Sequence, residues 1–230
     1  MGLLYQRGHG ITENDAFAAT LFQRSCDAKN AYGCRALADA YRKGVGVNQN
    51  LGRAEALYSK TCSGSRDFDC AIFFDGLGDD YRDGNGVTRN YDRAGGLYKK
   101  ACAFDNSYSY CCTDLLNIAY DFDTGKGVAT DHAKAAGFYA TACDGGVMMA
   151  CSNLAIDYSN GEGVTQNFVR AAELYTKACN SNDAAGCSGL GNLYWLGSGV
   201  EKNVEKARQY LSKGCNLGDK WGCDRLKELH

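Results

Sequence analysis

The sequence contains no proline in 230 residues, so glycine is the main residue available to end its helices. Long apolar runs are also absent, and nothing approaches the roughly 18 residues that a transmembrane helix needs. Acidic and basic residues are interspersed and nearly balanced, with a net charge of −2. A basic stripe for nucleic acid and an acidic disordered tail are therefore both excluded.

Recognisable catalytic and metal-binding motifs are missing as well. There is no Gly-x-Ser-x-Gly elbow, no Ser-x-x-Lys or Lys-Thr-Gly, and no His-Glu-x-x-His. The three histidines, His9, His132 and His230, lie far apart and outside any short cysteine knuckle of the kind that binds zinc. We therefore assign no catalytic residue, no metal and no cofactor.

Cysteine, in contrast, is abundant, with 13 copies arranged in pairs. Five pairs share one spacing, and the sixth is distorted because two cysteines follow its first member. The pairs are Cys26/Cys34, Cys62/Cys70, Cys143/Cys151, Cys179/Cys187 and Cys215/Cys223, with Cys102 followed by Cys111 and Cys112. One pair in each segment predicts a repeat protein held by disulfides.

Disulfides persist in oxidising compartments, so the pairs favour a secreted or periplasmic protein. Met1-Gly2 leads almost directly into the first repeat without a signal peptide, and we therefore expect a mature chain whose leader has been removed.

Glycine motifs recur in register with the cysteines. Each has the form Gly-x-Gly followed by Val or Ile, and an Asn or Asp stands three residues later. The motifs begin at Gly8, Gly44, Gly84, Gly125, Gly161 and Gly197, and the Asn or Asp residues are Asn14, Asn50, Asn90, Asp131, Asn167 and Asn203. Glycine supplies the positive φ that ends a helix, and Asn or Asp caps the start of the next one. Each motif is therefore predicted to connect two helices.

Apolar residues recur at helical spacing on both sides of each connection. One helix, called B, runs from the cap to the first cysteine of a pair, and the next, called A, starts at the second cysteine. In helix A, Cys151, Leu154 and Tyr158 share one face, as do Cys187 and Leu190. The pattern predicts an all-α protein, a right-handed α/α solenoid of about six helix-turn-helix repeats, in which each disulfide joins helix B to the next helix A.

The repeat, Leu-x-x-x-Tyr-x-x-Gly-x-Gly-Val and then Asn/Asp-x-x-x-Ala-x-x-Leu-Tyr-x-Lys-Ala-Cys, resembles Sel1-like repeats, which are relatives of the tetratricopeptide repeat. With one cysteine pair per repeat, the chain is similar to the Helicobacter cysteine-rich protein family over essentially its whole length. The resemblance implies a single solenoid over 1–230. Its repeats are expected at about 1–30, 31–66, 67–106, 107–147, 148–183 and 184–219, with a C-terminal helix at 220–230.

Two repeats depart from the pattern. Cys70 precedes Leu77 by seven residues instead of three, which predicts a helix A longer by about one turn. In the next repeat, Cys112 lies four residues before Leu116 and on its face, so we predict the bridge Cys102–Cys112 and an odd thiol at Cys111. That thiol is either exposed, where it could react or join two chains, or buried and inert.

Asp80 and Asp157 stand where the repeat usually has an apolar residue. They either provide a polar lining for the concave surface or are exposed carboxylates in a looser repeat, and we favour the second.

The sequence is best explained as a scaffold that binds a protein or peptide in its concave groove. The expected contacts are residues that the repeat does not prescribe: Arg42, Phe73, Phe74, Arg82, Tyr108, Tyr110, Asp121 and Trp195. Trp, Tyr and Arg are frequent in binding hot spots. The alternatives are that Phe73 and Phe74 pack the longer helix and that Trp195 stacks near Tyr194.

The resemblance implies three further expectations. Sel1-like proteins of bacteria include immunity proteins against secreted toxins and factors that engage host proteins. The cysteine-rich relatives are associated with β-lactam binding and weak β-lactamase activity, which is our alternative function. We expect a monomer, with a dimer through Cys111 as the other possibility.

Overall fold

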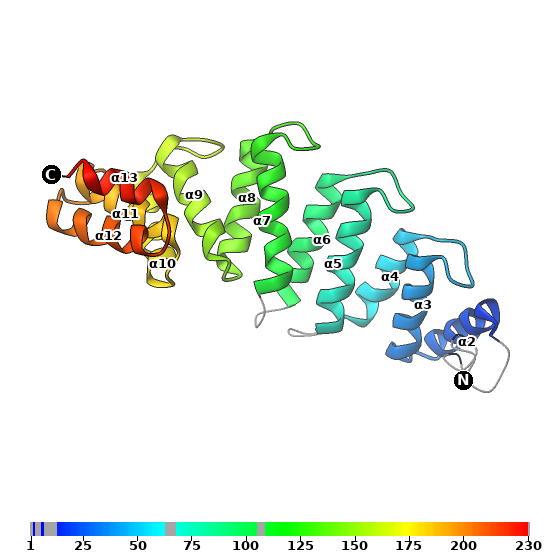
Figure 1. Ribbon diagram of the computed structural model, residues 1–230. Helices are drawn as coiled ribbons and strands as arrows, with labels where there is room; N and C mark the ends of the chain where they lie inside the picture. The colour runs from blue at the N-terminus through cyan, green and yellow to red at the C-terminus, as the bar shows by residue number, and fades with distance from the viewer. Residues whose placement is uncertain (1, 3–5, 7–12, 63–67, 105–108, 230) are drawn as a thin grey trace. The chain divides into compact units, whose positions relative to one another are not determined.

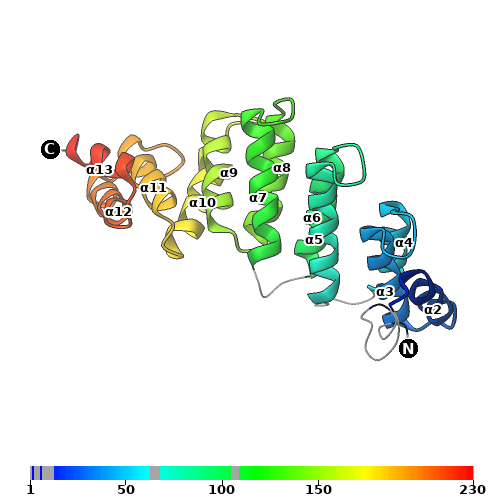
Figure 2. The same cartoon turned by 45° about the vertical axis from the view of Figure 1, so that its right-hand side comes forward.

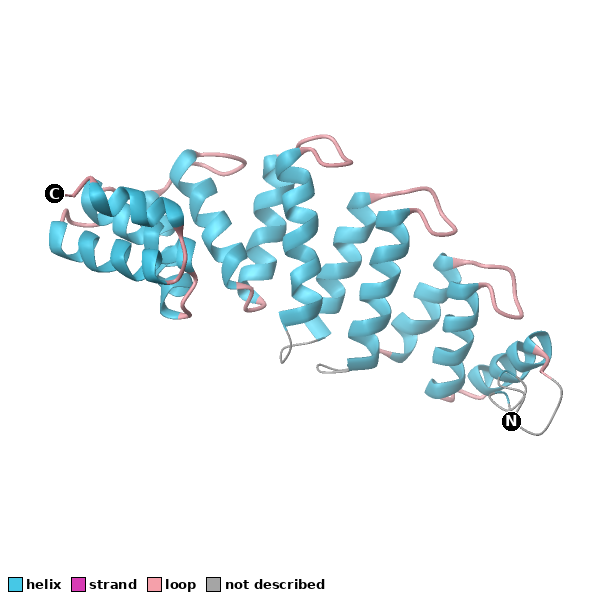
Figure 3. Ribbon diagram, in the orientation of Figure 1, coloured by secondary structure: helices cyan, strands magenta, loops and turns pink. Residues whose placement is uncertain are grey.

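The computed structural model describes residues 2, 6, 13–62, 68–104 and 109–229. These residues form helices joined by turns, without a strand among them, so the predicted all-α solenoid class is confirmed (Figures 1 and 3). Within the same residues, no helix is both long and apolar enough to cross a bilayer. The helices are α2 Asp15–Asp27, α3 Ala31–Lys43, α4 Leu51–Thr61, α5 Phe68–Asp83, α6 Tyr91–Phe104, α7 Ser109–Thr124, α8 His132–Asp144, α9 Met148–Asn160, α10 Phe168–Asn180, α11 Ala184–Leu196, α12 Val204–Asn216 and α13 Lys220–Lys227.

Side-chain caps start the B helices where the sequence predicts them. The Asn50 side chain accepts a hydrogen bond from the backbone N–H of Arg53 at 2.9 Å, and Asn203 does the same for Lys206 at 2.9 Å. The A helices end at glycine, as at Gly161, whose φ of 78° is left-handed. Both ends of each connection are thus fixed by local sequence.

The chain forms two compact units, each described here by itself. Unit 1 spans 1–107 and unit 2 spans 108–230. The B helices are α2, α4, α6, α8, α10 and α12, and the A helices are α3, α5, α7, α9, α11 and α13. In unit 1, α3 packs between α2 and α4, and α5 packs on α6; in unit 2, α11 packs between α10 and α12 (Figure 2). The single solenoid over 1–230 stays a prediction.

Within each unit, disulfides join the end of a B helix to the start of the next A helix, so the prediction of disulfide bonds is confirmed. Bridges with a sequence separation of 8 are Cys26–Cys34, Cys62–Cys70, Cys143–Cys151, Cys179–Cys187 and Cys215–Cys223. Cys102 and Cys112 are each disulfide-bonded as well, whereas Cys111 is a thiol. Cys111 is 2% exposed, which favours the buried, inert alternative over a thiol that reacts or joins chains.

The two irregular repeats have longer A helices. Helix α5 has 16 residues where α3 has 13, so the predicted additional turn is confirmed. Helix α7 also has 16 residues, but Leu116 does not anchor it. Ile118 is fully buried in the position that precedes the glycine motif by the usual interval, whereas Leu116 is only half-buried. The sequence pattern uses Leu116 as the reference leucine of this helix, but the inserted residues shift the register, so that Ile118 fills the core position.

At four of the B-helix caps, the basic residue three positions later covers the aromatic residue near the end of the preceding A helix. The Arg53 guanidinium lies 5.4 Å from the Tyr41 ring, and the Lys206 ammonium lies 5.1 Å from the Tyr194 ring. Such cation–π contacts contribute about 0.5–1 kcal/mol each at exposed sites. They join the helices on the two sides of a glycine turn.

Lysine residues also join consecutive B helices in unit 2. The Lys177 ammonium donates to the Cys143 carbonyl at 2.9 Å, and Lys213 donates to the Cys179 carbonyl at 2.8 Å. A cation here satisfies a carbonyl at the end of a helix and complements the helix dipole. We call these contacts the lysine ties.

Replacing Gly191 with alanine is expected to destabilise unit 2 by about 1–3 kcal/mol. A Cβ on Gly191 in α11 would lie 2.8 Å from Leu211 Cγ and 3.0 Å from the Ala207 carbonyl oxygen of α12. The matched control is Gly137→Ala in α8, where a Cβ meets nothing within 4 Å and better helix propensity should add up to about 1 kcal/mol. Urea unfolding of both variants tests the pair, and equal effects would contradict close packing at Gly191.

Candidate ligand grooves on the A helices

The hollows formed by the described residues include one groove against the A helices of each unit. The unit 1 groove is a hollow of about 680 Å³ between α3 and α5, with Tyr58 of α4 at its edge. The unit 2 groove is a hollow of about 620 Å³ bordered by α9, α10, α11 and the start of α13. Each volume is in the range of small-ligand or side-chain pockets.

The unit 2 groove has mainly apolar walls. Phe168 and Tyr175 of α10 form one side, and Leu196 and Trp221 stand at its rim, exposed by 58% and 46%. Burial raises the pKa of Tyr175 to about 12, so its hydroxyl stays protonated. Large exposed apolar side chains around a hollow are typical of a surface that a partner covers.

Asn192 supplies a polar group inside this apolar groove. On α11 it shares one face with Gly189 and Leu196, because three and four residues make about one turn. Its Oδ1 atom is buried without a hydrogen-bond partner among the described residues. A buried acceptor of this kind costs free energy until a donor reaches it.

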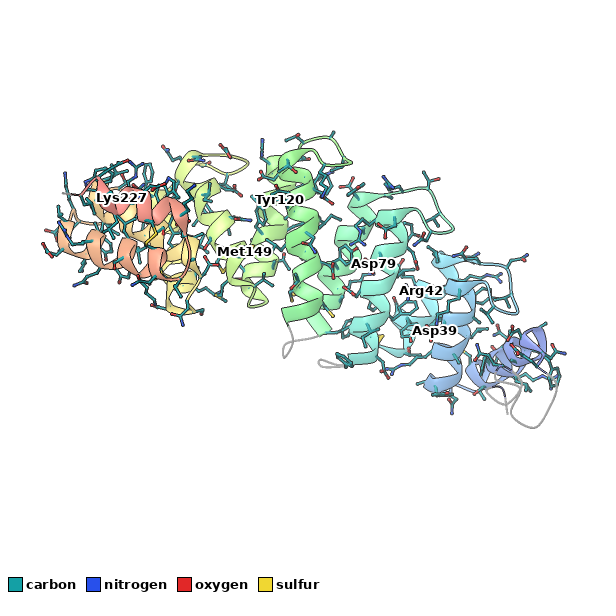
Figure 4. All side chains as sticks on the ribbon, in the orientation of Figure 1. Asp39, Arg42, Asp79, Tyr120, Met149 and Lys227 are labelled. Carbon is teal, nitrogen blue, oxygen red and sulfur yellow. A yellow bond between two sulfur atoms is a disulfide. The ribbon has the colours of Figure 1, made fainter. Side chains whose placement is uncertain are left out.

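The unit 1 groove is charged. From α3 it is lined by Tyr32, Arg35, Asp39, Arg42 and Lys43, which recur at helical spacing and therefore share a face, and from α5 by Asp69, Ile72 and Phe73. Figure 4 labels Asp39 and Arg42 on α3 and Asp79 on the neighbouring α5.

Both arginines of this groove are held by carboxylates of α5. Arg35 Nη1 lies 3.0 Å from Asp69 Oδ2. Arg42 Nε lies 2.6 Å from Asp80 Oδ2, and its Nη2 donates to the Gly76 carbonyl at 2.6 Å. These contacts tie α3 to α5 and fix the guanidinium groups.

Asp39 differs, because it is half-buried between these arginines without a hydrogen bond or ion pair to any described residue. Burial raises the pKa of its carboxyl, while the positive charges of Lys43 and Arg42 partly oppose that rise.

The residues predicted to contact a partner have several different positions. Arg42 lines the unit 1 groove, as Phe73 does at its base. However, Phe73 and Phe74 are each only 2% exposed and pack on Tyr58 and Phe104, so they belong to the core and their assignment as contacts was wrong. The longer helix needs apolar side chains on its inner face.

Arg82 pairs with Asp79 and Asp83 at 2.9 Å each, outside both grooves. Half-buried Trp195 packs with Leu211 and Leu229 under the Arg225 guanidinium, at 5.0 Å, instead of stacking on Tyr194.

Asp121 is half-buried on α7 and outside both grooves. Tyr108 and the side chain of Tyr110 lie outside the described residues. The proposed contact role of Arg42, Arg82, Asp121 and Trp195 stays a prediction.

Neither Asp80 nor Asp157 is an exposed carboxylate, so the favoured interpretation was wrong. Asp80 is 13% exposed and bound to Arg42. Asp157 is 3% exposed, and burial, with the negative charge of Asp123, raises its pKa to about 7.

Sequence reasoning missed Asp39, Asn192 and Trp221. Asp39 and Asn192 occupy the same repeat position, five residues before the glycine motif, where Asp79, Tyr120 and Ile156 also stand. Variation at one position of an otherwise regular repeat could have identified them.

Histidine, cysteine and acidic side chains do not converge in threes anywhere in the described chain in a way that could hold a metal ion.

Comparisons with known proteins agree on one repeat. The model of the Sel1 repeat matches residues 1–30, 31–65, 75–103, 115–147, 149–183 and 184–219. A search of curated proteins found no match.

Among solved structures, the chain is similar to a protective antigen of uropathogenic Escherichia coli with an SLR fold, at 25% identity and a TM-score of 0.54, over 98% of this chain and 46% of that one. The chain thus spans about half the length of that antigen. It is also similar to Helicobacter pylori cysteine rich protein B, at 30% identity and a TM-score of 0.45, over 62% of this chain and 99% of that one.

Proposed function

The chain belongs to the Sel1 repeat family, and from this premise we propose that it is a protein-interaction scaffold whose unit 2 groove binds an extended segment of a partner protein. The observation that carries the proposal is the combination of an apolar groove with a buried acceptor that has no donor among the described residues, Asn192 Oδ1.

An extended peptide supplies what this groove lacks. Its backbone N–H groups are donors, and one of them can bond Asn192 Oδ1 once the half-buried side-chain amide turns toward the groove, while neighbouring apolar side chains cover Trp221, Leu196 and Phe168. Removing the exposed apolar surface from water contributes about 25 cal/mol per Å² before the costs of association. The hydrogen bond adds orientation, because it forms only at one register of the peptide.

Truncating Trp221 to alanine is expected to weaken peptide binding at least about tenfold, because an aromatic side chain at the rim is lost. The probe is a random peptide library displayed on phage and selected against the full chain. Peptides recovered should be rich in apolar residues, and their dissociation constants for the wild type and Trp221→Ala would be measured by fluorescence polarisation.

Val204→Ala is the matched control, because Val204 is 42% exposed but lies outside the groove. It should bind the selected peptides as the wild type does, and Trp221→Phe should restore part of the affinity. Selected peptides that bind Trp221→Ala as tightly as the wild type would refute the groove assignment.

We further propose that the protein works outside the cytoplasm, secreted or in the periplasm. Support comes from its disulfides, which a reducing cytosol does not maintain. The similarity to a protective antigen agrees with exposure to a host, although the chain spans only 46% of that protein. Engagement of a host protein and immunity against a toxin both fit a binding scaffold, and fractionation of the producing cell with identification of the bound partner would separate them.

The β-lactam alternative receives no support from either groove. The described residues that line them offer no activated nucleophile beside a general base, so we do not propose it.

A further inference from the structure

We propose that the unit 1 groove is a second, independent binding site, which takes a lysine or arginine side chain of a partner against the carboxylate of Asp39.

The carboxylate of Asp39 lines this groove together with exposed apolar side chains. Asp39 lies seven residues after Tyr32 on the same face of α3, and Ile72 faces them from α5. Tyr32 is 59% exposed and Ile72 is 50% exposed. A long basic side chain combines an apolar stem with a charged end, so its methylene groups can lie along Tyr32 and Ile72 while its cation reaches Asp39.

The ion pairs of the lining residues favour a cation as the ligand of this groove. The guanidinium of Arg35 is neutralised by Asp69 and that of Arg42 by Asp80, so an anion that binds either arginine would have to displace a carboxylate of α5. Lys43 stands four residues after Asp39 and is exposed, without an ion pair to it. Lys43 is hydrated, so Asp39 is the half-buried charged group of this groove that has no hydrogen bond or ion pair to a described residue.

Incomplete solvation of Asp39 strengthens the argument. A half-buried carboxylate without donors loses part of its hydration and gains no hydrogen bond in return. A bound ammonium or guanidinium group replaces the missing donors, and a hydrogen bond between charged groups is stronger than one between neutral groups.

Asp79 of α5 occupies the same repeat position as Asp39 but has partners within the fold. Asp79 accepts a hydrogen bond from the Tyr98 hydroxyl at 2.9 Å and pairs with Arg82 at 2.9 Å. Its carboxylate is occupied from within the fold, whereas α3 leaves the equivalent Asp39 open to a ligand.

The test uses the full oxidised chain and a capped pentapeptide with the sequence glycine–leucine–lysine–leucine–glycine. A second peptide carries norleucine at the centre, which keeps the stem and removes the charge, and a third carries glutamate. Titrations followed by ¹⁵N NMR should show shifts on α3 and α5, with the lysine peptide binding about tenfold more tightly than the norleucine peptide.

Asp39→Asn should abolish the preference for lysine, so that the lysine and norleucine peptides bind alike. Asp27→Asn is the matched control, because it removes the same charge from an exposed position of unit 1 outside the groove. It should retain the preference, as should Trp221→Ala, since that residue belongs to the other groove. Wild-type protein that binds the norleucine or glutamate peptide as well as the lysine peptide would overturn the proposal, and so would an unchanged preference in Asp39→Asn.

Discussion

Replacing Asp157 with leucine is expected to raise the melting temperature at pH 8 by roughly 5–10 °C, because a buried charge is removed. Asp157 is 3% exposed, and its Oδ2 atom is buried without a hydrogen-bond partner among the described residues. The equivalent position in the next repeat is Leu193, which is also 3% exposed, so this interface accommodates an apolar side chain.

The pH dependence has a definite sign. The carboxyl of Asp157 has a pKa of about 7 in the folded chain, against 3.8 for an ordinary aspartate, mainly because of burial and then because of Asp123. The folded state therefore holds the proton more strongly, and the free energy of unfolding falls as the pH rises from about 4 to about 7. The loss is on the order of 3 kcal/mol, and it should be absent in Asp157→Leu.

The raised pKa of Asp157 arises at a pair of repeat positions through which consecutive A helices contact each other. In unit 1 this pair is Arg42 with Asp80, which forms an ion pair. In unit 2 the corresponding residues are Asp123 and Asp157, two carboxylates, and Asp123 is held by His132 at 2.7 Å. Like charges at these positions raise the pKa of Asp157, where opposite charges stabilise unit 1.

Two variants serve as controls for Asp157→Leu. Calorimetry between pH 4 and pH 8 measures the melting temperatures of all three variants. Asp80→Leu removes a paired carboxylate and should lower the melting temperature at neutral pH. Asp123→Arg should recreate the ion pair of unit 1 and raise stability at pH 8. If Asp157→Leu were destabilising at pH 8, or if its stability fell between pH 4 and pH 7 as much as that of the wild type, the assignment of a buried carboxyl with a raised pKa would be wrong.

Reduction of the disulfides is expected to unfold most of the helical structure at 25 °C. Five of the bridges close a short loop with a sequence separation of 8, and such a loop contributes about 2.5 kcal/mol on the chain-entropy model. The sum over the chain is comparable to the whole stability of a typical protein. Circular dichroism at 222 nm, before and after reduction and alkylation, measures the loss.

Removal of one bridge measures how much a single disulfide contributes to the free energy of unfolding. Replacing both Cys179 and Cys187 with alanine should lower the free energy of unfolding by about 2.5 kcal/mol and leave the fold intact. Cys111→Ala breaks no bridge and should leave the response to reduction unchanged. A reduced and alkylated chain with full helical signal and a cooperative transition would show that packing alone maintains the repeats.

The fold was largely predictable because its determinants are local. Asn50, Asn167 and Gly161 act on the backbone within a few residues, so their roles can be inferred from the sequence. The exception is α7, where an insertion and two adjacent cysteines obscure the register of the repeat. The sequence pattern places Leu116 at the core position, which Ile118 occupies in the structure.

The grooves were less predictable because their residues meet across repeats. Phe73 and Phe74 were expected on the surface because the repeat does not prescribe them, yet the longer α5 buries both. Asp39 and Trp221 face grooves formed by helices that are distant in sequence. Only packing decides whether an irregular residue fills the core, couples two repeats or reaches a ligand.

The lysine ties have an evolutionary consequence. Lys177 and Lys213 each reach a cysteine carbonyl 34 residues earlier, so both halves of the interface are encoded at fixed places in every such module. Duplication of one module by unequal recombination would add both a lysine donor and a cysteine carbonyl acceptor. Deletion of one module would leave a lysine and a cysteine carbonyl that still match. Relatives of this chain can therefore change in length by whole modules without inventing a new interface, while selection acts on the groove residues of each copy.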